Sequence, residues 1–528
     1  MFKGHPKGLI AAALSNMGER FGYYIMNAVL LLFLCSKFGI PDQVAAIIYA
    51  VFYFLIYVLS LPGGVIADKL QNYKGTIMAG LITMASGYVL LSIPLMATPE
   101  TKMGILVLTC VALFIIAFGN GLFKGNLQAI VGQMYDNLEA EAEKTGDPEK
   151  IAEAKSKRDP GFQIFYVFIN IGGVIAPFVA PFLRQWWLGR NAMTYNADLP
   201  ALCHQYINDA TGMSADQMNN LTTLMAEANQ NFDIANMGAA CSSYLEVFNT
   251  GVHYSFIASV AAMLVSLLIF VITKKKFPNP TKKVAAAVVE YTPEEKASRA
   301  KEIKQRMAGL YAVLGICVFF WMAFHQNGQS LSLFARDFVN TQNVAPEVWQ
   351  FLNPFIVIVL TPVIMWIFGT KWGRKISTPR KIAFGMMFAM SAYLFLMIFS
   401  MQAGYPSGEA FRAMPVAEST GMKAGAWVLI VTYFFLTVAE LFISPLGLSF
   451  VSKIAPKHIQ GICQGLWLSA TAFGNLLIML GPIFYNKLPN LWMCWLIFMA
   501  ICFIAMAIMF GMLKWLEKIT GDRKEIAK

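Results

Sequence analysis

Residues 104–134 read GILVLTCVALFIIAFGNGLFKGNLQAIVGQM, and Lys124 is the only charged side chain among them. A helix that spans a bilayer needs about 20 consecutive, mostly apolar residues, so this run is long enough to cross one. A charge inside a span costs free energy unless it faces a cavity or a partner. The run therefore predicts a membrane-spanning helix with a buried, functional charge.

The composition extends this conclusion to the whole chain of 528 residues. Hydrophobic residues make up 57% of the sequence and charged residues only 13%, with a mean hydropathy of +0.56. Soluble domains carry about 25% charged residues, so a water-soluble fold is excluded. The formal net charge of +11 lies almost entirely between apolar runs, which indicates membrane topology and not binding of nucleic acid.

Twelve apolar runs have the length that a span requires. They lie near residues 14–34, 45–67, 77–97, 104–134, 161–186, 249–273, 307–335, 348–370, 380–402, 425–450, 460–485 and 490–514. Lys and Arg gather at the chain ends and in the even-numbered connections, so the positive-inside rule places both termini in the cytoplasm. The first run carries charges, which favours a retained helix over a signal peptide.

The twelve spans divide six and six. We expect an N-terminal six-helix bundle at residues 1–273, a cytoplasmic linker at 274–306 and a C-terminal six-helix bundle with its tail at 307–528. A Gly-rich, basic turn joins the second and third spans of each half, which favours a repeated half, although any inner loop can hold Gly and Lys. The alternating charges from Glu294 to Lys304 indicate a short surface helix.

The connection between the fifth and sixth spans, residues 187–248, is a long polar outer loop that holds Cys203 and Cys241. The other cysteines lie in or beside apolar runs, where Cys behaves as a small hydrophobic residue. Two cysteines alone in an oxidising loop predict a disulfide, which stabilises such a loop by roughly 4 kcal/mol in the chain-entropy model. Two free thiols are the alternative.

The polar residues of the first span recur at helical spacing. Asn16, Arg20, Tyr23 and Asn27 form one stripe, which inside a span faces a cavity or partner helices and not lipid. Glu19 adjoins Arg20, but consecutive helical positions point about 100° apart, so we expect each charge to need another partner.

Lys124 and Glu440 are the other charges well inside spans, and Lys124 lies at a depth comparable to that of Glu19. Opposite charges about 4 Å apart attract by about 4 kcal/mol at an effective dielectric of about 20. Protonating a carboxylate in such a cluster removes that attraction and lets a helix contact open. We expect this cluster to couple protons to movement, with structural ion pairing as the alternative.

Neutral polar groups and large rings also interrupt the apolar spans, where each either packs or contacts a ligand. These residues are Asn170, Asn353, Ser444, Tyr57, Trp321 and Trp467. The five histidines lack metal-ligand spacing, and neither a phosphate loop nor a nucleophile elbow is visible. The sequence therefore predicts no metal, no cofactor and no enzymatic activity.

The stretch Asn16-Met-Gly-Glu19-Arg20-Phe21-Gly-Tyr23-Tyr24 resembles the E-x-x-E-R-F-x-Y-Y signature of the proton-dependent oligopeptide transporters of the major facilitator superfamily. Further stretches similar to that family are Gly121–Asn126, Arg158–Gly172, Phe320–Trp321, Glu440–Ser449 and Gly474–Asn475. The resemblance covers nearly the whole chain except residues 187–248 and the linker. It implies an all-α membrane protein with the major facilitator fold, twelve transmembrane helices in two six-helix bundles, in the plasma (inner) membrane.

The same resemblance implies roles for individual residues. The positions that match the family's coupling charges are Glu19, Arg20, Lys124 and Glu440. The positions that match its peptide pocket are Tyr23, Tyr24, Tyr57, Asn170, Trp321, Asn353, Ser444 and Trp467.

Three positions depart from the family pattern. Asn16 stands where the family has the first glutamate of its signature, and Asn27 where many members place an arginine that receives the substrate carboxylate. His325 precedes Gln326, where an acidic residue is usual. With an unperturbed pKa of about 6.5, His325 is either a further proton carrier or a neutral hydrogen-bonding group. Asn27 stays a candidate pocket residue.

The leading hypothesis is a monomeric secondary transporter that carries di- and tripeptides with protons through the lipid bilayer by alternating access. An inward potential of 100 mV contributes about 2.3 kcal/mol per proton. The rival is a carrier of the same fold that moves a non-peptide solute, or peptides with weak coupling, and Asn16 and Asn27 support it. A membrane-embedded enzyme or receptor would need a catalytic or metal-binding arrangement that the sequence lacks.

Overall fold

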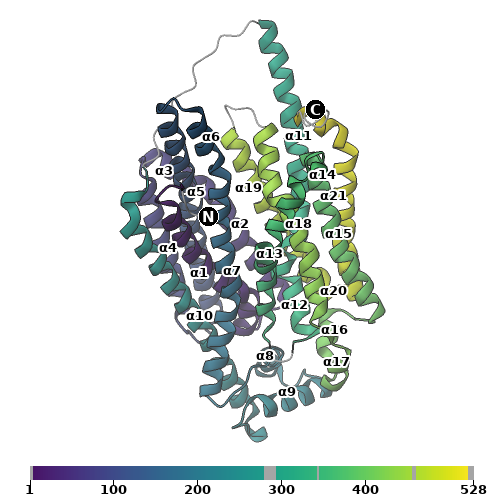
Figure 1. Cartoon of the computed structure of the whole chain (residues 1–528). Coiled ribbons are helices and arrows are strands. Elements are labelled where there is room, and N and C mark those ends of the chain that lie inside the picture. Colours follow the sequence, from purple (N-terminus) through teal and green to yellow (C-terminus); the bar gives the residue numbers. More distant parts are fainter. Residues whose placement is uncertain (1–3, 279–292, 342–343, 455–459, 521–528) are drawn as a thin grey trace.

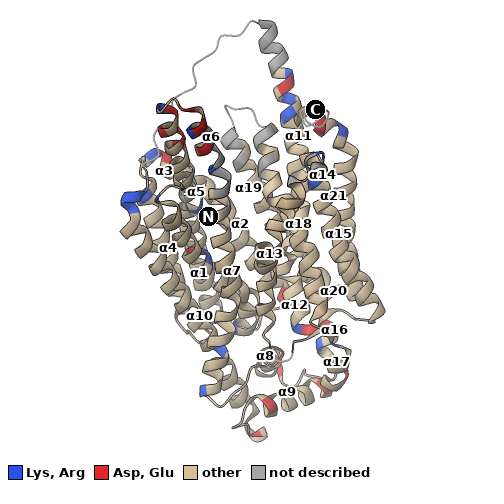
Figure 2. Ribbon diagram, viewed as in Figure 1, with Lys and Arg blue, Asp and Glu red and all other residues tan. Residues whose placement is uncertain are grey.

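A computed structural model describes residues 4–278, 293–341, 344–454 and 460–520. The central part of the predicted linker and the last residues of the C-terminal tail therefore lie outside the described residues. Twelve of the described helical segments are long and apolar enough to cross a membrane, which confirms the predicted all-α membrane fold (Figure 1). Figure 2 shows that charged residues gather at the two ends of these helices and are sparse between them.

The first six spans form one bundle, drawn in purple to teal in Figure 1. They are α1 (Leu9–Phe38), α2 (Asp42–Val58) with α3 (Ser60–Leu70), α4 (Tyr73–Ser92), α5 (Lys102–Lys144), α7 (Arg158–Arg190) and α10 (Met237–Thr273). Short elements accompany them: α6 (Pro148–Ser156) and η2 (Lys274–Lys276) lie at one end, called here the linker end. Because α5 runs past Met134, the predicted end of the fourth span, its last turns project from this end.

The last six spans form the second bundle, drawn in green to yellow. They are α11 (Pro293–Phe324) with η3 (His325–Gly328) and α12 (Ser330–Asp337), η4 (Pro346–Phe351) with α13 (Leu352–Gly369), α15 (Thr378–Gln402), α18 (Trp427–Ile454), α19 (Gln460–Leu477) with α20 (Leu480–Lys487), and α21 (Leu491–Thr520). The minor elements are α14 (Lys371–Arg374), α16 (Gly408–Ala413), α17 (Val416–Met422) and the paired strands β1 (Val339–Asn340) and β2 (Ala424–Gly425).

The seventh span differs from the prediction at its start, and its α-helix is interrupted near its middle. The charged stretch from Glu294 to Lys304 is the beginning of α11 and not a separate surface helix. The α-helix then ends at Phe324, and η3 carries the chain to α12. A short 3₁₀ segment inside a span often marks a functional hinge, and here it holds His325.

The polar connection after α7 is folded. It contains α8 (Leu199–Asp209), α9 (Ala215–Ala228) and η1 (Ile234–Asn236), and we call residues 191–236 the cap. Ser214 begins α9 with a capping box, since its hydroxyl accepts from the Gln217 amide and the Gln217 side chain accepts from the Ser214 amide. The cap lies across one end of the two bundles, called here the cap end.

The two cap-side cysteines bear on the predicted disulfide. Cys203 of α8 and Cys241 of α10 are both fully buried. Both are free thiols in this structure, and a disulfide between them stays a prediction. Burial raises the pKa of Cys203, which keeps the sulfur protonated and slow in thiol exchange.

Candidate functional site

A cavity of about 340 Å³ lies between the two bundles and collects most of the predicted site residues. Twelve of the fourteen predicted coupling and pocket residues line it. They are Arg20, Lys124, His325, Glu440, Tyr24, Asn27, Tyr57, Asn170, Trp321, Asn353, Ser444 and Trp467. The two exceptions, Glu19 and Tyr23, are buried directly behind this lining. We call this space the central cavity.

Glu19 and Arg20 pair with each other, contrary to the expectation that each would need a different partner. Arg20 Nε and Nη2 donate to the two carboxylate oxygens of Glu19 at 2.6 and 2.9 Å. The long arginine side chain bends back to meet its neighbour. The pair can therefore form although the two backbone positions point in different directions. Asn120 of α5 also donates to Glu19, at 2.7 Å, so the carboxylate is buried with its charge satisfied.

Lys124 faces the cavity without a carboxylate partner among the described residues. Its ammonium lies 4.1 Å from the centroid of the Tyr57 ring, a cation–π contact between α5 and α2. The predicted cluster of Glu19, Arg20 and Lys124 is therefore a closed ion pair beside a separate cation. A ligand carboxylate that enters the cavity finds its available charge at Lys124.

Glu440 of α18 supplies the opposite charge from the other bundle. Asn353 of α13 donates to its carboxylate at 2.7 Å and to the Thr437 hydroxyl at 3.1 Å. The amide thus holds the carboxylate in place and does not neutralise it. The central cavity therefore carries a cation on the wall of the first bundle and an anion on the wall of the second.

Asn27 and Tyr23 are linked, which explains why only one of them lines the cavity. The Tyr23 hydroxyl donates to Asn27 Oδ1 at 3.2 Å, and the Tyr49 hydroxyl donates to the same oxygen at 3.0 Å. The Tyr23 ring lies under the Arg20 guanidinium, 4.9 Å from it. Tyr23 therefore positions two cavity residues and does not reach the cavity itself.

His325 is held between aromatic rings. It stacks on Trp321 with ring centroids 5.1 Å apart, and the Tyr53 ring meets it edge-on at 5.1 Å. Tyr53 comes from α2, so this contact joins the two bundles beside η3. Sequence reasoning missed Tyr53, although it precedes Tyr57 by one helical turn and so shares its face.

Other polar residues of the cavity were not among the predicted site residues, although Asn16 and Tyr166 lie in stretches that resemble the family. These other residues are Asn16, Gln128, Tyr166, Asn327, Gln350 and Thr471. Only Asn16 lay on a recognisable polar stripe. Gln350 donates to the backbone oxygen of Ala28 at 3.3 Å and so ties η4 to α1.

The POT family model matches residues 74–293 and 283–492, which is more than half of the chain. The chain belongs to the POT family. Named relatives match along most of their length. The peptide transporter YePEPT of Yersinia enterocolitica is 28% identical over 90% of this chain and 87% of its own. The dipeptide and tripeptide permease B of Photorhabdus luminescens is 26% identical over 89% of this chain and 86% of its own.

Solved structures of POT transporters share the fold. A POT family transporter in complex with 5-aminolevulinic acid aligns with a TM-score of 0.67, at 19% identity and over 98% of both chains. The peptide transporter POT in complex with sulfate aligns with a TM-score of 0.66, at 21% identity, over 98% of this chain and 96% of its own. The major facilitator fold predicted from the sequence is therefore confirmed.

In this POT-family transporter, a network of charges joins the bundles at the cap end. Arg336, in the last turn of α12, pairs with Asp42 at the start of α2 at 3.0 Å and with Asp337 at 2.7 Å. Arg412 of α16 pairs with the same two carboxylates, at 3.2 and 2.7 Å. Asp42 and Asp337 are both buried, so each carboxylate depends on these arginines.

A second buried ion pair crosses between the bundles nearby. Arg184 of α7 lies 2.7 Å from Glu347 of η4, with side chains only 3% and 0% exposed. These cap-end charges were not among the predicted site residues, because they stand near the ends of spans, where charge is ordinary. Together the two groups join the two bundles at the cap end.

Proposed function

We propose that this protein is a proton-coupled symporter of di- and tripeptides that works by alternating access. The observation that carries the proposal is the placement of Lys124 and Glu440 on opposite walls of one cavity between the bundles. A short peptide is a zwitterion, so its carboxylate fits the cation and its ammonium fits the anion. Both bundles then hold the same substrate, which lets binding bias their relative movement.

The relatives support the peptide as substrate class. Two of them are named a peptide transporter and a dipeptide and tripeptide permease, and each matches this chain over most of both lengths. The aromatic residues of the central cavity, Tyr24, Tyr57, Trp321 and Trp467, add sequence-tolerant apolar surface for varied side chains.

Orientation follows from charge. The linker end carries most of the lysines and arginines near the spans, and we therefore place it, with both termini, in the cytoplasm of a plasma (inner) membrane. The cap then lies outside. With the cap end tied shut, this structure corresponds to the half of the cycle in which substrate exchanges with the cytoplasm. We propose that one chain suffices for transport.

Proton binding is coupled to substrate binding because the substrate disturbs the Glu19–Arg20 ion pair. A peptide carboxylate at Lys124 lies close to the Glu19–Arg20 pair and competes for Arg20. Glu19 then loses part of its stabilisation as an anion and gains from a proton. His325, which touches both Trp321 and Tyr53, is the second proposed proton carrier, and it stands where the bundles meet.

Uptake of dialanine into proteoliposomes, driven by an imposed potential and pH gradient, tests the proposal. Lys124→Ala should abolish gradient-driven accumulation, because it removes a cavity cation that has no carboxylate partner among the described residues. Lys144→Ala, on the exposed end of the same helix, is the matched control and should accumulate like the wild type. A correctly inserted Lys124→Ala protein with wild-type accumulation would refute this role for the cavity charges.

One observation favours the rival, a carrier of a small non-peptide zwitterion or a weakly coupled carrier. Asn27 offers no positive charge at the cavity wall, and its carbonyl oxygen is already engaged by two tyrosines. A POT-fold neighbour was solved with 5-aminolevulinic acid, a zwitterion smaller than a tripeptide. Uptake of labelled 5-aminolevulinic acid in preference to dialanine would decide for this alternative.

A further inference from the structure

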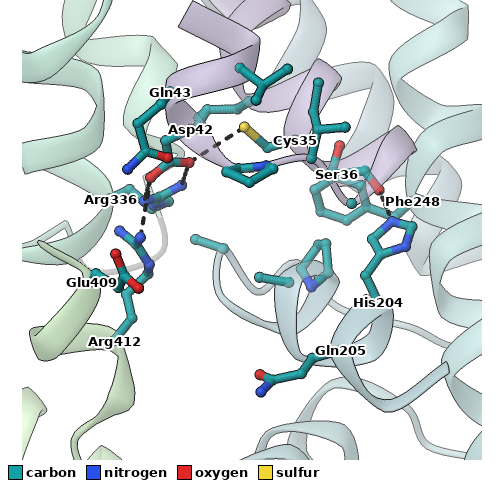
Figure 3. A pocket seen from close by; sticks show the side chains of 18 of the residues that line it. Cys35, Ser36, Asp42, Gln43, His204, Gln205, Phe248, Arg336, Glu409 and Arg412 are labelled. Carbon is teal, nitrogen blue, oxygen red and sulfur yellow. Dashed lines mark hydrogen bonds and ion pairs between the residues drawn. The ribbon is translucent and has the colours of Figure 1, made fainter. Parts of the chain in front are cut away.

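A second, larger cavity of about 600 Å³ lies between the cap and the closed cap end. We call it the outer chamber. Figure 3 shows its walls: Asp42, Arg336 and Arg412 on one side, His204 and Phe248 on the other, and Gln205 of the cap facing the space between them. Small-molecule sites are typically cavities of about 300–1,000 Å³, so its size suits a ligand as large as a short peptide.

The charges around the outer chamber balance. Its lining holds the cations Arg184, Arg336, Arg412 and Lys487 and the anions Asp42 and Glu409. Two further carboxylates, Asp337 and Glu347, pair with three of these arginines from behind the lining. Burial lowers the pKa of His204, so its ring adds no charge at neutral pH. A ligand with one charge would leave an uncompensated charge in this set, whereas a zwitterion would not.

The chamber also presents hydrogen-bonding capacity that the protein leaves unused. Arg184 is 2% exposed, lines the chamber and stacks over Tyr195 at 4.1 Å. Its Nε has no hydrogen-bond partner among the described residues. A buried donor without a partner costs free energy, and a shift of the Arg184 side chain toward the chamber would let a ligand carboxylate accept from it. Apolar groups of Leu32, Ile40 and Pro200 give the remaining wall.

We propose that the outer chamber is a second binding site for a zwitterionic peptide, in which the ligand competes with the ion pairs that hold the cap end shut. The ligand's ammonium pairs with Asp42 or Glu409, and the ligand's carboxylate pairs with Arg336, Arg412 or Arg184. Each such exchange replaces a contact between the bundles with a contact to the ligand. Substrate waiting outside thereby favours opening toward itself. This inference rests on the proposed peptide transport for its choice of ligand.

Binding of dialanine to the purified full chain by calorimetry tests the proposal. Ser444→Trp fills the central cavity, so any remaining saturable binding reports the outer chamber. In that background, Ala201→Trp, on the chamber-facing side of α8, should weaken dialanine binding at least tenfold. Ala226→Trp, on the exposed side of α9, is the matched control and should leave that binding unchanged.

A charge variant keeps the test decisive if Ala201→Trp does not fold. Glu409→Gln in the Ser444→Trp background should weaken binding of dialanine about tenfold, because it removes an anion for the ligand's ammonium. It should not change binding of N-acetyl dialanine, which lacks that ammonium.

The possible outcomes separate the two proposals. No binding of dialanine to the wild type would overturn peptide transport itself. Binding to the wild type that Ser444→Trp removes entirely would leave peptide transport standing and overturn the outer chamber. Residual binding that Ala201→Trp and Glu409→Gln leave unchanged would also overturn it.

Discussion

Lys124 is the cation that the central cavity leaves available, because Glu19 already neutralises Arg20 through two short hydrogen bonds. Among the described residues, the Tyr57 ring holds the ammonium by a cation–π contact that contributes on the order of 1 kcal/mol. A charge-assisted bond to a carboxylate contributes about 1.5–3 kcal/mol. Because the second interaction is the stronger one, we expect a ligand carboxylate to displace the ring and become the main partner of Lys124.

We expect Asn27 to set the selectivity for the carboxyl terminus of a substrate. With asparagine in place of an arginine, the ligand loses one charge-assisted bond. We therefore expect amidated dialanine to compete for uptake within about tenfold of the free acid. Competition against labelled dialanine uptake measures this ratio. A wild-type preference for the free acid far above tenfold would show that another cation has taken the place of the arginine.

Asn27→Arg should raise the preference for the free acid by about tenfold or more, because it adds a cation at the cavity wall. The substitution also removes the oxygen to which Tyr23 and Tyr49 donate. Asn27→Ala removes the same oxygen without adding charge, and it should leave the preference unchanged. Equal effects of the two substitutions would assign the change to the lost tyrosine bonds.

At the scale of single helices, periodicity predicted the cavity face of α1 but not everything on it. Asn16, Arg20 and Asn27 line the central cavity as the stripe predicts. Tyr23 lies on the same stripe, yet its hydroxyl turns to Asn27. The helices of the cap were not predicted, because elements of 11 and 14 residues in a polar segment bury a face only against neighbours that sequence does not show.

In the described part of the chain, a side chain of α9 ties the cap to the second bundle. Asn220 donates to the Met414 backbone oxygen at 2.9 Å and accepts from the Val416 amide at 3.1 Å. Asn220 is 5% exposed, so both bonds are sheltered from water. In the sequence, the cap lies between two spans of the first bundle. When the cap end opens, the two bonds of Asn220 must therefore break, or the cap must move with the second bundle.

Asn220→Ala should open the cap end more often, because it removes both bonds and leaves two backbone groups unpaired in the closed state. Alkylation of Cys35 reports the opening, since its thiol donates to Asp42 in the wall of the outer chamber. We expect alkylation at Cys35 to be severalfold faster than in the wild type, read by mass spectrometry of that peptide. Asn219→Ala, one residue away and exposed, should behave like the wild type. Equal rates in all three proteins would show that the cap does not restrain the gate.

At the scale of the whole molecule, the two bundles meet through charges that are distant in sequence. Asp42 and Arg336, for example, are 294 positions apart. The sequence predicted two bundles because hydropathy is a local property of each span. It could not predict which span ends pair, because that depends on the position of one bundle against the other. The pairing of span ends at the closed cap end is therefore known from the structure and not from the sequence.

The Arg184–Glu347 pair allows the closed state to be weakened selectively. Both side chains are buried when the cap end is shut, whereas opening would expose them to water. Removing one partner of a buried pair costs about 3–5 kcal/mol, because the other charge stays buried and uncompensated. That cost falls on the closed state alone. A difference of about 3 kcal/mol shifts the equilibrium between closed and open forms on the order of 100-fold.

Arg184→Met should therefore open the cap end, whereas Arg184→Met with Glu347→Leu should close it again, because two apolar side chains replace a buried pair at little cost. Hydrogen exchange of the backbone in α12 and η4, followed by mass spectrometry, measures the opening. We expect fast exchange in the single variant and near wild-type exchange in the double variant. Arg190→Met, on the same helix but exposed, controls for loss of an arginine. If the double variant exchanges as fast as the single one, the pair contributes packing and not charge to closure, and the electrostatic account of the cap end fails.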